Sequence, residues 1–214
     1  MQKIAIIGTG GFSREVLDVI LAMNDSGCGY DFVGFIGEKH RDGGINGYPV
    51  IGTDEEINSN IDTKLAVVIG VGSPILKKRI REKYNNPNIY FPTIIHPSVI
   101  IGNKNQSIIG QGCVICAGTI MTTNFCIGDF VTLNLMCTVG HDTVIGDYSS
   151  FMPSVNISGE VSIGEMVYVG TGAKIINGLN ILVGATVGAG AVVTKDVQQN
   201  VTVAGVPAKI IKYK

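Results

Sequence analysis

The second half of this chain repeats every six residues. Every sixth residue from Ile109 to Val193 is apolar, although only 45% of all residues are hydrophobic. An unbroken run of that length in the best of six frames has a chance probability on the order of 10⁻⁵, so the repeat is real. Helices and ordinary strands lack this period, whereas a chain that turns a corner every six residues has it, and three such sides close a triangular coil. The pattern therefore predicts a hexapeptide β-helix.

Three slots of each repeat are restricted. The large apolar slot holds Ile109, Ile115, Met121, Ile127, Leu133, Val139, Ile145, Phe151, Ile157, Ile163, Val169, Ile175, Ile181, Val187 and Val193. The slot after it is mostly small, as at Gly128 and Gly146, and a small or branched residue recurs three slots later, as at Val131. We expect the large aliphatic residue to fill the coil interior and the small residue after it to permit the bend.

Composition narrows the class of protein. The 214 residues carry a formal net charge of −1 and only 15% are charged, which argues against a nucleic-acid binder that relies on a basic patch. No apolar run approaches the roughly 18 residues of a membrane span. The opening MQKIAIIGTGG places glycines where the hydrophobic stretch of a signal peptide would continue. We therefore expect a cytoplasmic protein with neither a membrane nor a nucleic-acid partner.

The cysteines indicate packing and not metal binding. The five are Cys28, Cys113, Cys116, Cys126 and Cys137, of which Cys113 and Cys116 form a CxxC. These two occupy coil positions where any small apolar residue would serve, and neither a second CxxC nor a histidine at zinc spacing accompanies them. We expect no metal site.

Residues 1–92 follow a different pattern, in which short apolar strands alternate with helices. The expected strands are 3–7, 31–36, 65–70 and 89–91, and the expected helices are 13–23 and 74–84, the latter basic and amphipathic. Such alternation predicts a small, Rossmann-like parallel sheet with helices packed on it. Pro92 and Pro97 punctuate the chain before the coils, so we place the β-helix and a tail in residues 93–214. Residues 103–107 interrupt the hexads and should bulge from a coil corner.

The first turn of this N-terminal part, GTGGFSRE, is a partial dinucleotide-binding fingerprint. It follows a strand and opens a helix, the context in which backbone N–H groups and a helix N-terminus hold phosphate. Ser13 stands where the third glycine would be, and only Glu38 is placed to bind a ribose as in NAD sites. We favour another nucleotide or a pyrophosphate over NAD, and a tight turn without a ligand stays open.

Among the three histidines, His141 is the candidate for chemistry. His40 lies in a polar, Gly-rich loop, and His96 precedes Pro97, where we expect it to cap the first coil. His141 lies within the repeat at a slot that faces outward, and Asp142 follows directly. A carboxylate beside an imidazole can fix its tautomer and raise its basicity, giving a general base near neutral pH. The alternative is a surface histidine on a β-helix wall.

Several features together resemble one group of acyltransferases. They are the Gly-rich α/β N-terminus, IIHPSV at residues 94–99, the unbroken hexads, the His-Asp pair and GVPAK at residues 205–209. Over essentially its whole length the chain resembles the hexapeptide-repeat sugar acetyltransferases of the sialic acid O-acetyltransferase and bacillosamine or perosamine N-acetyltransferase type. The resemblance implies a left-handed β-helix, a homotrimer, and acetyl-CoA as co-substrate in a groove between neighbouring β-helices.

The resemblance also implies roles for individual residues. His141 matches the catalytic base, Asp142 the acid that raises its basicity, and Asn134 an asparagine near the reacting centre. Some members carry a second histidine nine residues beyond the base, where this chain has Ser150. The residues expected to line acetyl-CoA are Ser150, Gly159, Gly170, Thr171, Gly188, Ala189 and Lys209, with the three glycines stacked along one wall and Lys209 at a CoA phosphate. The residues expected to hold the nucleotide end of an activated sugar are Gly10, Gly11, Phe12, Gly37, Glu38 and Gly70.

We therefore predict an acetyl-CoA-dependent N-acetyltransferase acting on a nucleotide-linked 4-amino-4,6-dideoxy sugar for bacterial surface glycans such as lipopolysaccharide. The expected mechanism is direct transfer with His141 as general base, because no cysteine lies beside it in the sequence to form an acyl-enzyme. The nearest alternative is O-acetylation of a sugar such as sialic acid, which needs the same base. An NAD(P)-binding oxidoreductase and a non-enzymatic trimeric scaffold are the alternatives from other classes.

Overall fold

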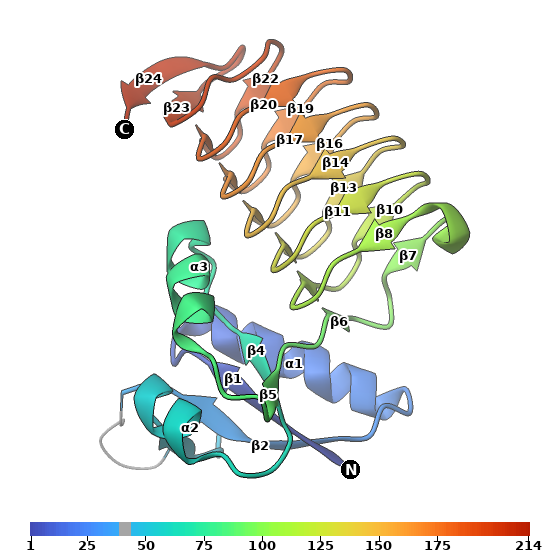
Figure 1. Ribbon diagram of the computed structural model, residues 1–214. Coiled ribbons are helices and arrows are strands. Elements are labelled where there is room, and N and C mark those ends of the chain that lie inside the picture. The colour runs from blue at the N-terminus through green and yellow to red at the C-terminus, as the bar shows by residue number, and fades with distance from the viewer. Residues whose placement is uncertain (39–43) are drawn as a thin grey trace.

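The computed structural model describes residues 1–38 and 44–214, and the chain forms two parts (Figure 1). A sheet with helices lies at the N-terminal end, and a long stack of coils carries the rest of the chain. His40, which we expected in a polar loop, lies outside the described residues. In the described part of the chain, no helix is long and apolar enough to cross a membrane.

The N-terminal sheet is parallel and has five strands in the order β3-β2-β1-β4-β5. Its elements are β1 (Gln2–Ile7), α1 (Gly11–Asp25), β2 (Tyr30–Ile36), β3 (Val50–Gly52), α2 (Asp54–Asn60), β4 (Leu65–Ile69), α3 (Pro74–Lys83) and β5 (Ile89–Tyr90). The expected strands and helices are all present, with ends that differ by at most two residues. β3 and α2 were not expected, although Thr53 and Glu56 form a capping box whose spacing is visible in the sequence.

The two parts of the chain share an apolar core. Every residue of β4 is buried, and so are the last four of β1, as in parallel sheets that are covered on both faces. α1 buries Val16, Leu17 and Ile20, the spacing of an amphipathic helix. These residues belong to the same cluster as Ile94 and Val114 of the coils. The sheet is therefore held against the coils by a continuous hydrophobic contact.

The coils build three flat walls, each a parallel sheet that receives one strand from every 18-residue coil. Wall 1 contains β6 (Ile94–Ile95), β9 (Val114–Ile115), β12 (Thr132–Leu133), β15 (Ser150–Phe151), β18 (Tyr168–Val169) and β21 (Thr186–Val187). Wall 2 contains β7 (Ile100–Ile101), β10 (Ile120–Met121), β13 (Thr138–Val139), β16 (Asn156–Ile157), β19 (Lys174–Ile175) and β22 (Val192–Val193). Wall 3 contains β8 (Ile108–Ile109), β11 (Cys126–Ile127), β14 (Val144–Ile145), β17 (Ser162–Ile163) and β20 (Asn180–Ile181). The first corner joins walls 1 and 2, the second joins walls 2 and 3, and the third joins walls 3 and 1.

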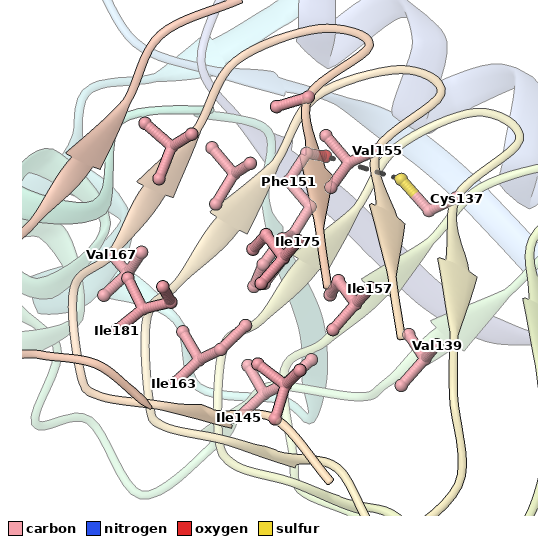
Figure 2. Packing of buried hydrophobic residues seen from close by; sticks show 14 of the residues in the cluster. Cys137, Val139, Ile145, Phe151, Val155, Ile157, Ile163, Val167, Ile175 and Ile181 are labelled. Carbon is pink, nitrogen blue, oxygen red and sulfur yellow. Dashed lines mark hydrogen bonds between the residues drawn. The ribbon is translucent and has the colours of Figure 1, made fainter. Parts of the chain in front are cut away.

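The large apolar residues of the hexads point into the coil interior, as expected. All of them from Ile115 to Val193 are buried, and Figure 2 shows Ile145, Ile157 and Ile163 among those packed inside. Ile109, near the open end of the stack, is half-buried. The repeat therefore fills one continuous core that runs along the axis of the coils.

The bends are not made where we expected. The residue three places after each large apolar residue from Ile109 to Val187 is left-handed, and at eight successive corners it is not glycine. Asp142 is one of these residues, with a φ of 56°. Its backbone N–H donates to the carbonyl oxygen of Thr123 in the preceding coil at 3.1 Å, and equivalent bonds recur at the other corners. These bonds offset the cost of left-handed residues that carry side chains.

The residues that directly follow the large apolar ones are small for another reason. A Cβ on Gly146 would lie 2.6 Å from the backbone nitrogen of Glu165 in the next coil, and one on Gly164 would lie 2.7 Å from that of Val183. Neither glycine has a positive φ. Their smallness is therefore required by the close stacking of the coils and not, as we expected, by the bend.

The two departures from the hexad pattern lie at the ends of the stack. Residues 103–107 bulge as expected, and η1 (Lys104–Gln106) within them is a 3-10 turn capped by the side chain of Asn103. Beyond the last coil, β23 (Val201–Ala204) extends wall 1, and β24 (Lys209–Tyr213) pairs with it antiparallel. β23 also buries apolar side chains against the end of the core.

A buried lysine ties α3 to the coils. The Lys77 side chain is 1% exposed, and its Nζ donates to the Phe130 carbonyl oxygen at 2.7 Å. It also donates to the Thr132 Oγ1 at 3.0 Å and to the Ser149 carbonyl oxygen at 3.1 Å, so all three ammonium hydrogens have acceptors. Loss of hydration lowers the pKa of Lys77 to about 7.

Lys77 is expected to make stability depend on pH. Its pKa rises from about 7 in the fold to its ordinary 10.5 on unfolding, so between these values the unfolded chain binds the extra proton. The free energy of unfolding should therefore rise with pH across that window, by at most about 1.4 kcal/mol per pH unit. Urea unfolding of the wild type and Lys77→Met, at one protein concentration from pH 6.5 to 9.5, measures the difference between them. A difference that does not change with pH would contradict this expectation.

Candidate active site

His141 and Asp142 stand at the second corner, directly after β13. The His141 Nδ1 lies 2.8 Å from the Asp142 Oδ2, and the two side chains are 57% and 49% exposed. An ionised carboxylate can only accept a hydrogen bond, so Nδ1 carries the hydrogen and Nε2 keeps a free lone pair. The expected outward orientation of His141 is confirmed, and this arrangement can remove a proton from an incoming nucleophile.

Asp142 is held in its ionised form by two hydrogen bonds. The first joins it to His141, and in the second the Asn124 Nδ2 donates to the Asp142 Oδ1 at 3.1 Å. Both bonds lower the pKa of Asp142 below its ordinary value, and the bond to His141 contributes most. Asn124 lies one coil earlier in the same left-handed position, with a φ of 57°. It was not anticipated from the sequence, although its spacing of 18 residues from Asp142 places both on one column.

Gly159 lies one coil after His141 and leaves room for the imidazole. A Cβ on Gly159 would lie 2.6 Å from the Cε1 and 2.8 Å from the Cδ2 of His141, so one of the two groups would have to move. We expected Gly159 to stack with Gly170 and Gly188 along one wall, and this is wrong. Gly159 follows β16 of wall 2, whereas the other two follow strands of wall 1. The spacing from 159 to 170 is not a multiple of a full coil, so the columns differ.

Four of the other residues expected at acetyl-CoA lie on the first corner, together with Asn134, which was expected near the reacting centre. Asn134, Gly170 and Gly188 occupy one column of this corner, and Thr171 and Ala189 are the next residues along the chain. A Cβ on Gly170 would lie 2.5 Å from the backbone nitrogen of Ala189, so coil stacking already requires this glycine. His141 and Asp142 occupy a different corner. Within one chain, the structure does not bring these residues together with His141.

Asn134, Ser150 and Lys209 differ in their exposure. Asn134 is 4% exposed, and its Oδ1 accepts a hydrogen bond from the backbone N–H of Leu135 at 2.6 Å. Ser150 faces away from the coil interior on wall 1, yet it is fully buried, and among the described residues its Oγ has no hydrogen-bond partner. Lys209 begins β24 and is exposed. Of the three, only Lys209 is open to solvent in a single chain.

A cavity of about 320 Å³ opens beside the carboxyl ends of β1 and β2. Gly37 and Glu38 line it, as do Gly8 and Thr9 of the first turn. Ligands of open α/β sheets bind at this edge, outside the carboxyl ends of the parallel strands. Two of the residues expected to hold a nucleotide therefore face a cavity of the appropriate kind.

The start of α1 borders the same turn. Gly10 is its N-cap residue and Gly11 its first residue, and no side chain caps the helix, so its first N–H groups remain available to an anion. Phe12 is half-buried against the core of the sheet. Gly70 serves packing, because a Cβ there would lie 2.8 Å from the Cα of Ser13. Glycine at this position allows β4 and α1 to approach closely.

A larger cavity of about 470 Å³ lies between α3 and wall 1. Residues 73–75 at the start of α3 line one side, and Met152 and Tyr168 line the other. The loop between β4 and α3 borders both cavities, since Val71 lines the smaller one and Gly72 the larger. This second cavity was not anticipated from the sequence, because its two sides are far apart along the chain.

His141 lies on the far side of the coils from both cavities. α1 contacts β6 of wall 1, and Lys77 of α3 binds Thr132 of the same wall, so the N-terminal part covers wall 1. In a triangular coil, the corner opposite wall 1 is the second corner, which bears His141. His141 lines neither cavity in the described structure.

Relatives cover both parts of the chain. Residues 3–84 match the PglD N-terminal domain family. GDP-perosamine N-acetyltransferase from Escherichia coli O157:H7 is 31% identical over 180 residues, which are 84% of this chain and 80% of that enzyme. The crystal structure of PerB from Caulobacter crescentus with CoA and GDP-perosamine is 28% identical, with a TM-score of 0.89 over 99% of this chain and 98% of that one. The acetyltransferase domain of PglB from Neisseria gonorrhoeae FA1090 with acetyl coenzyme A is 32% identical, with a TM-score of 0.88 over 98% and 99% of the two chains.

The coil architecture and these relatives define an acyltransferase of the left-handed, hexapeptide-repeat class. The chain belongs to the family of sugar N-acetyltransferases that includes GDP-perosamine N-acetyltransferase. The expected resemblance, the two-part fold and the use of acetyl-CoA are thereby confirmed. In the described residues, no cluster of side chains could hold a metal ion.

Gly159→Ala is expected to lower kcat about ten-fold or more, because the methyl group displaces the imidazole and a shift of about 1 Å can cost up to 10²-fold. Gly159 has no positive φ, so alanine adds no backbone strain. CoA thiol release during acetyl transfer measures the rate. Asn177→Ala, one coil further along the same column, is the control and should keep the wild-type rate. A Gly159→Ala enzyme with normal turnover would show that the imidazole does not need this space.

Proposed function

We propose that this chain transfers the acetyl group of acetyl-CoA to the amino group of a nucleotide-linked amino sugar, with His141 as general base. The observation that carries the proposal is an exposed His141 whose Nδ1 is bound to Asp142 and whose Nε2 is free, in a member of this family. The binding of GDP-perosamine by a relative supports a nucleotide-linked acceptor. We further propose a 4-amino-4,6-dideoxy sugar destined for surface glycans such as lipopolysaccharide, and a cytoplasmic location.

In the proposed reaction the neutral amine attacks the thioester carbonyl, so a C–N bond forms while the carbonyl electron pair moves to oxygen. The His141 Nε2 accepts the proton that the amine loses, and Asp142 stabilises the imidazolium through the Nδ1–H. The C–S bond then breaks and the proton passes to the sulfur of CoA, which restores the neutral imidazole. A positioned base of this kind contributes about 10²–10⁴-fold. A backbone N–H of the coil or the Asn134 amide donates to the oxyanion.

The first corner is the proposed binding surface for acetyl-CoA. Its small residues Gly170, Thr171, Gly188 and Ala189 allow an extended pantetheine arm to lie against the backbone. Lys209 is exposed and supplies a cation for a CoA phosphate. Ser150 stays a predicted contact of the acetyl end. We propose that Gly159 acts indirectly. Because it has no side chain, it leaves the space that the imidazole of His141 occupies.

We propose residues 1–92 as the nucleotide-sugar domain and residues 93–214 as the acetyl-CoA domain. The uncapped start of α1, at Gly10, Gly11 and Phe12, would hold the pyrophosphate, and Gly37 with Glu38 would hold the ribose end. From there the sugar would pass the loop that follows Gly70 and enter the larger cavity, which borders the same loop.

A site built from these parts needs more than one copy of the chain. His141 lies on the opposite side of the coils from its own nucleotide cavity, so the amine must meet a His141 supplied by a neighbouring copy. Apolar residues stand exposed on walls 2 and 3, among them Ile100 at 59%, Ile108 at 64% and Val144 at 48%. Neighbouring copies around a three-fold axis would cover them and form a groove between adjacent coils, which favours a homotrimer.

His141→Ala and His141→Asn are expected to lower kcat by about 10²-fold or more, because the proton acceptor is lost. The melting temperature should hardly change, since the side chain points outward and fills no core position. Asp142→Asn should lower the rate less, because this residue tunes the imidazole without taking the proton. CoA thiol release and thermal unfolding measure both effects, with His96→Ala as the control histidine.

Near-normal turnover by His141→Ala would overturn the proposed base and leave alignment of the free amine with the thioester as the mechanism. The wild type should be assayed with nucleotide-linked amino sugars and with hydroxyl sugars. If CoA is released only with hydroxyl sugars, the proposed N-acetylation is wrong and O-acetylation is the activity.

Mixing two inactive variants tests whether the site is shared between copies. His141→Ala keeps the nucleotide cavity, whereas Thr9→Trp fills the cavity and keeps the histidine. If each site takes its cavity and its histidine from different copies, an equal mixture of co-refolded chains should recover about a quarter of the wild-type rate. Either variant alone is the control. A mixture no more active than its components would place the whole site within one chain.

A further inference from the structure

Lys77 is an unusual residue to find buried between two parts of a chain. Its three hydrogen-bond partners are two carbonyl oxygens and a hydroxyl group, so no carboxylate balances its charge among them. Burying an ammonium group in this way is unfavourable unless every hydrogen finds an acceptor. The arrangement therefore requires α3 to lie in one position on the coils. The proposed mechanism assigns no role to Lys77.

The acceptors fix Lys77 in three dimensions. Phe130 and Thr132 belong to one coil, and Ser149 belongs to the next, because β12 pairs with β15 across the coil boundary. Within the described residues, all side-chain hydrogen bonds from α3 to the coils come from Lys77. The Arg81 guanidinium adds a contact of another kind, 6.0 Å from the centre of the Phe130 ring.

Lys77 lies one helical turn beyond the start of α3, and its backbone N–H donates to the carbonyl oxygen of Ser73 at 2.9 Å. Residues 73–75 form one side of the 470 Å³ cavity, opposite Met152 and Tyr168 of the coils. The distance between these two sides therefore depends on where α3 is held. A helix held only by apolar contacts could slide or tilt on wall 1, whereas three directed hydrogen bonds define both its height and its angle.

We infer that Lys77 is a positioning residue for the acceptor: by fixing α3 on wall 1, it sets the width of the cavity that receives the sugar ring of the nucleotide-linked substrate. This inference rests on the proposed function. It assigns Lys77 to binding of the sugar nucleotide and not to binding of acetyl-CoA, because none of the residues proposed to line acetyl-CoA at the first corner lines this cavity. It also assigns no proton transfer to Lys77, which touches neither substrate.

Steady-state kinetics of Lys77→Met tests the inference. The KM for the nucleotide-linked sugar should rise about ten-fold, while the KM for acetyl-CoA and kcat should each change by less than about three-fold. Arg79→Met, an exposed change on the same helix, is the matched control and should behave as the wild type. Thr132→Val removes one of the three acceptors at nearly constant volume and should raise the KM for the sugar nucleotide by a smaller factor.

The outcomes separate this inference from the proposed function. A wild type that acetylates no nucleotide-linked sugar would overturn both. An active wild type whose KM for the sugar nucleotide stays the same in Lys77→Met would overturn only the role of Lys77, as would equal rises in the KM of both substrates, which indicate a general loss of structure. If Lys77→Met does not fold, Thr132→Val decides, and an unchanged KM for the sugar nucleotide in that variant overturns the inference.

Discussion

The structure depends on the stacking of one coil on the next at a fixed spacing of 18 residues. From Phe130 to Gly190, each left-handed corner residue donates its backbone N–H to a carbonyl oxygen of the coil before it, and the inward apolar residues pack against their equivalents in neighbouring coils. An insertion within a strand would shift every later side chain off its column and expose apolar residues. The extra residues of the bulge that contains η1 accordingly lie at a corner. Because of this regularity, the number of residues between two positions in the sequence determines where they lie relative to each other in the structure.

The candidate catalytic pair uses the same regularity. Asn124, Asp142 and Gly159 come from three successive coils, yet they surround one imidazole at one corner. Corner side chains point away from the core, so His141 can be held without disturbing the packing beneath it. Stacking of the coils therefore provides a rigid support for the site, which catalysis by a positioned base requires.

The hexads predicted the walls, the interior and the outward orientation of His141, because a β-helix converts local spacing directly into structure. The bend was assigned to the wrong slot, since glycine is the usual left-handed residue and the corner hydrogen bonds that support Phe130 or Asp142 there are invisible in a sequence. The expectation that Gly159 shares a wall with Gly170 was wrong, because only residues separated by the length of a whole coil share a column. Lys77 was read as one more basic residue of an amphipathic helix, since lysine is rarely buried and its acceptors lie more than 50 residues away.

The most direct test of His141 as general base is to determine which of its ring nitrogens carries the hydrogen in the free enzyme. Nitrogen NMR of histidine-labelled protein distinguishes the two tautomers, and with three histidines in the chain, His141→Asn assigns the signal. When the ring is neutral, we predict a hydrogen on Nδ1 and none on Nε2, because ionised Asp142 must receive a donor. A neutral ring that carries its hydrogen on Nε2 would exclude His141 as the base, because that nitrogen could not accept the proton of the attacking amine.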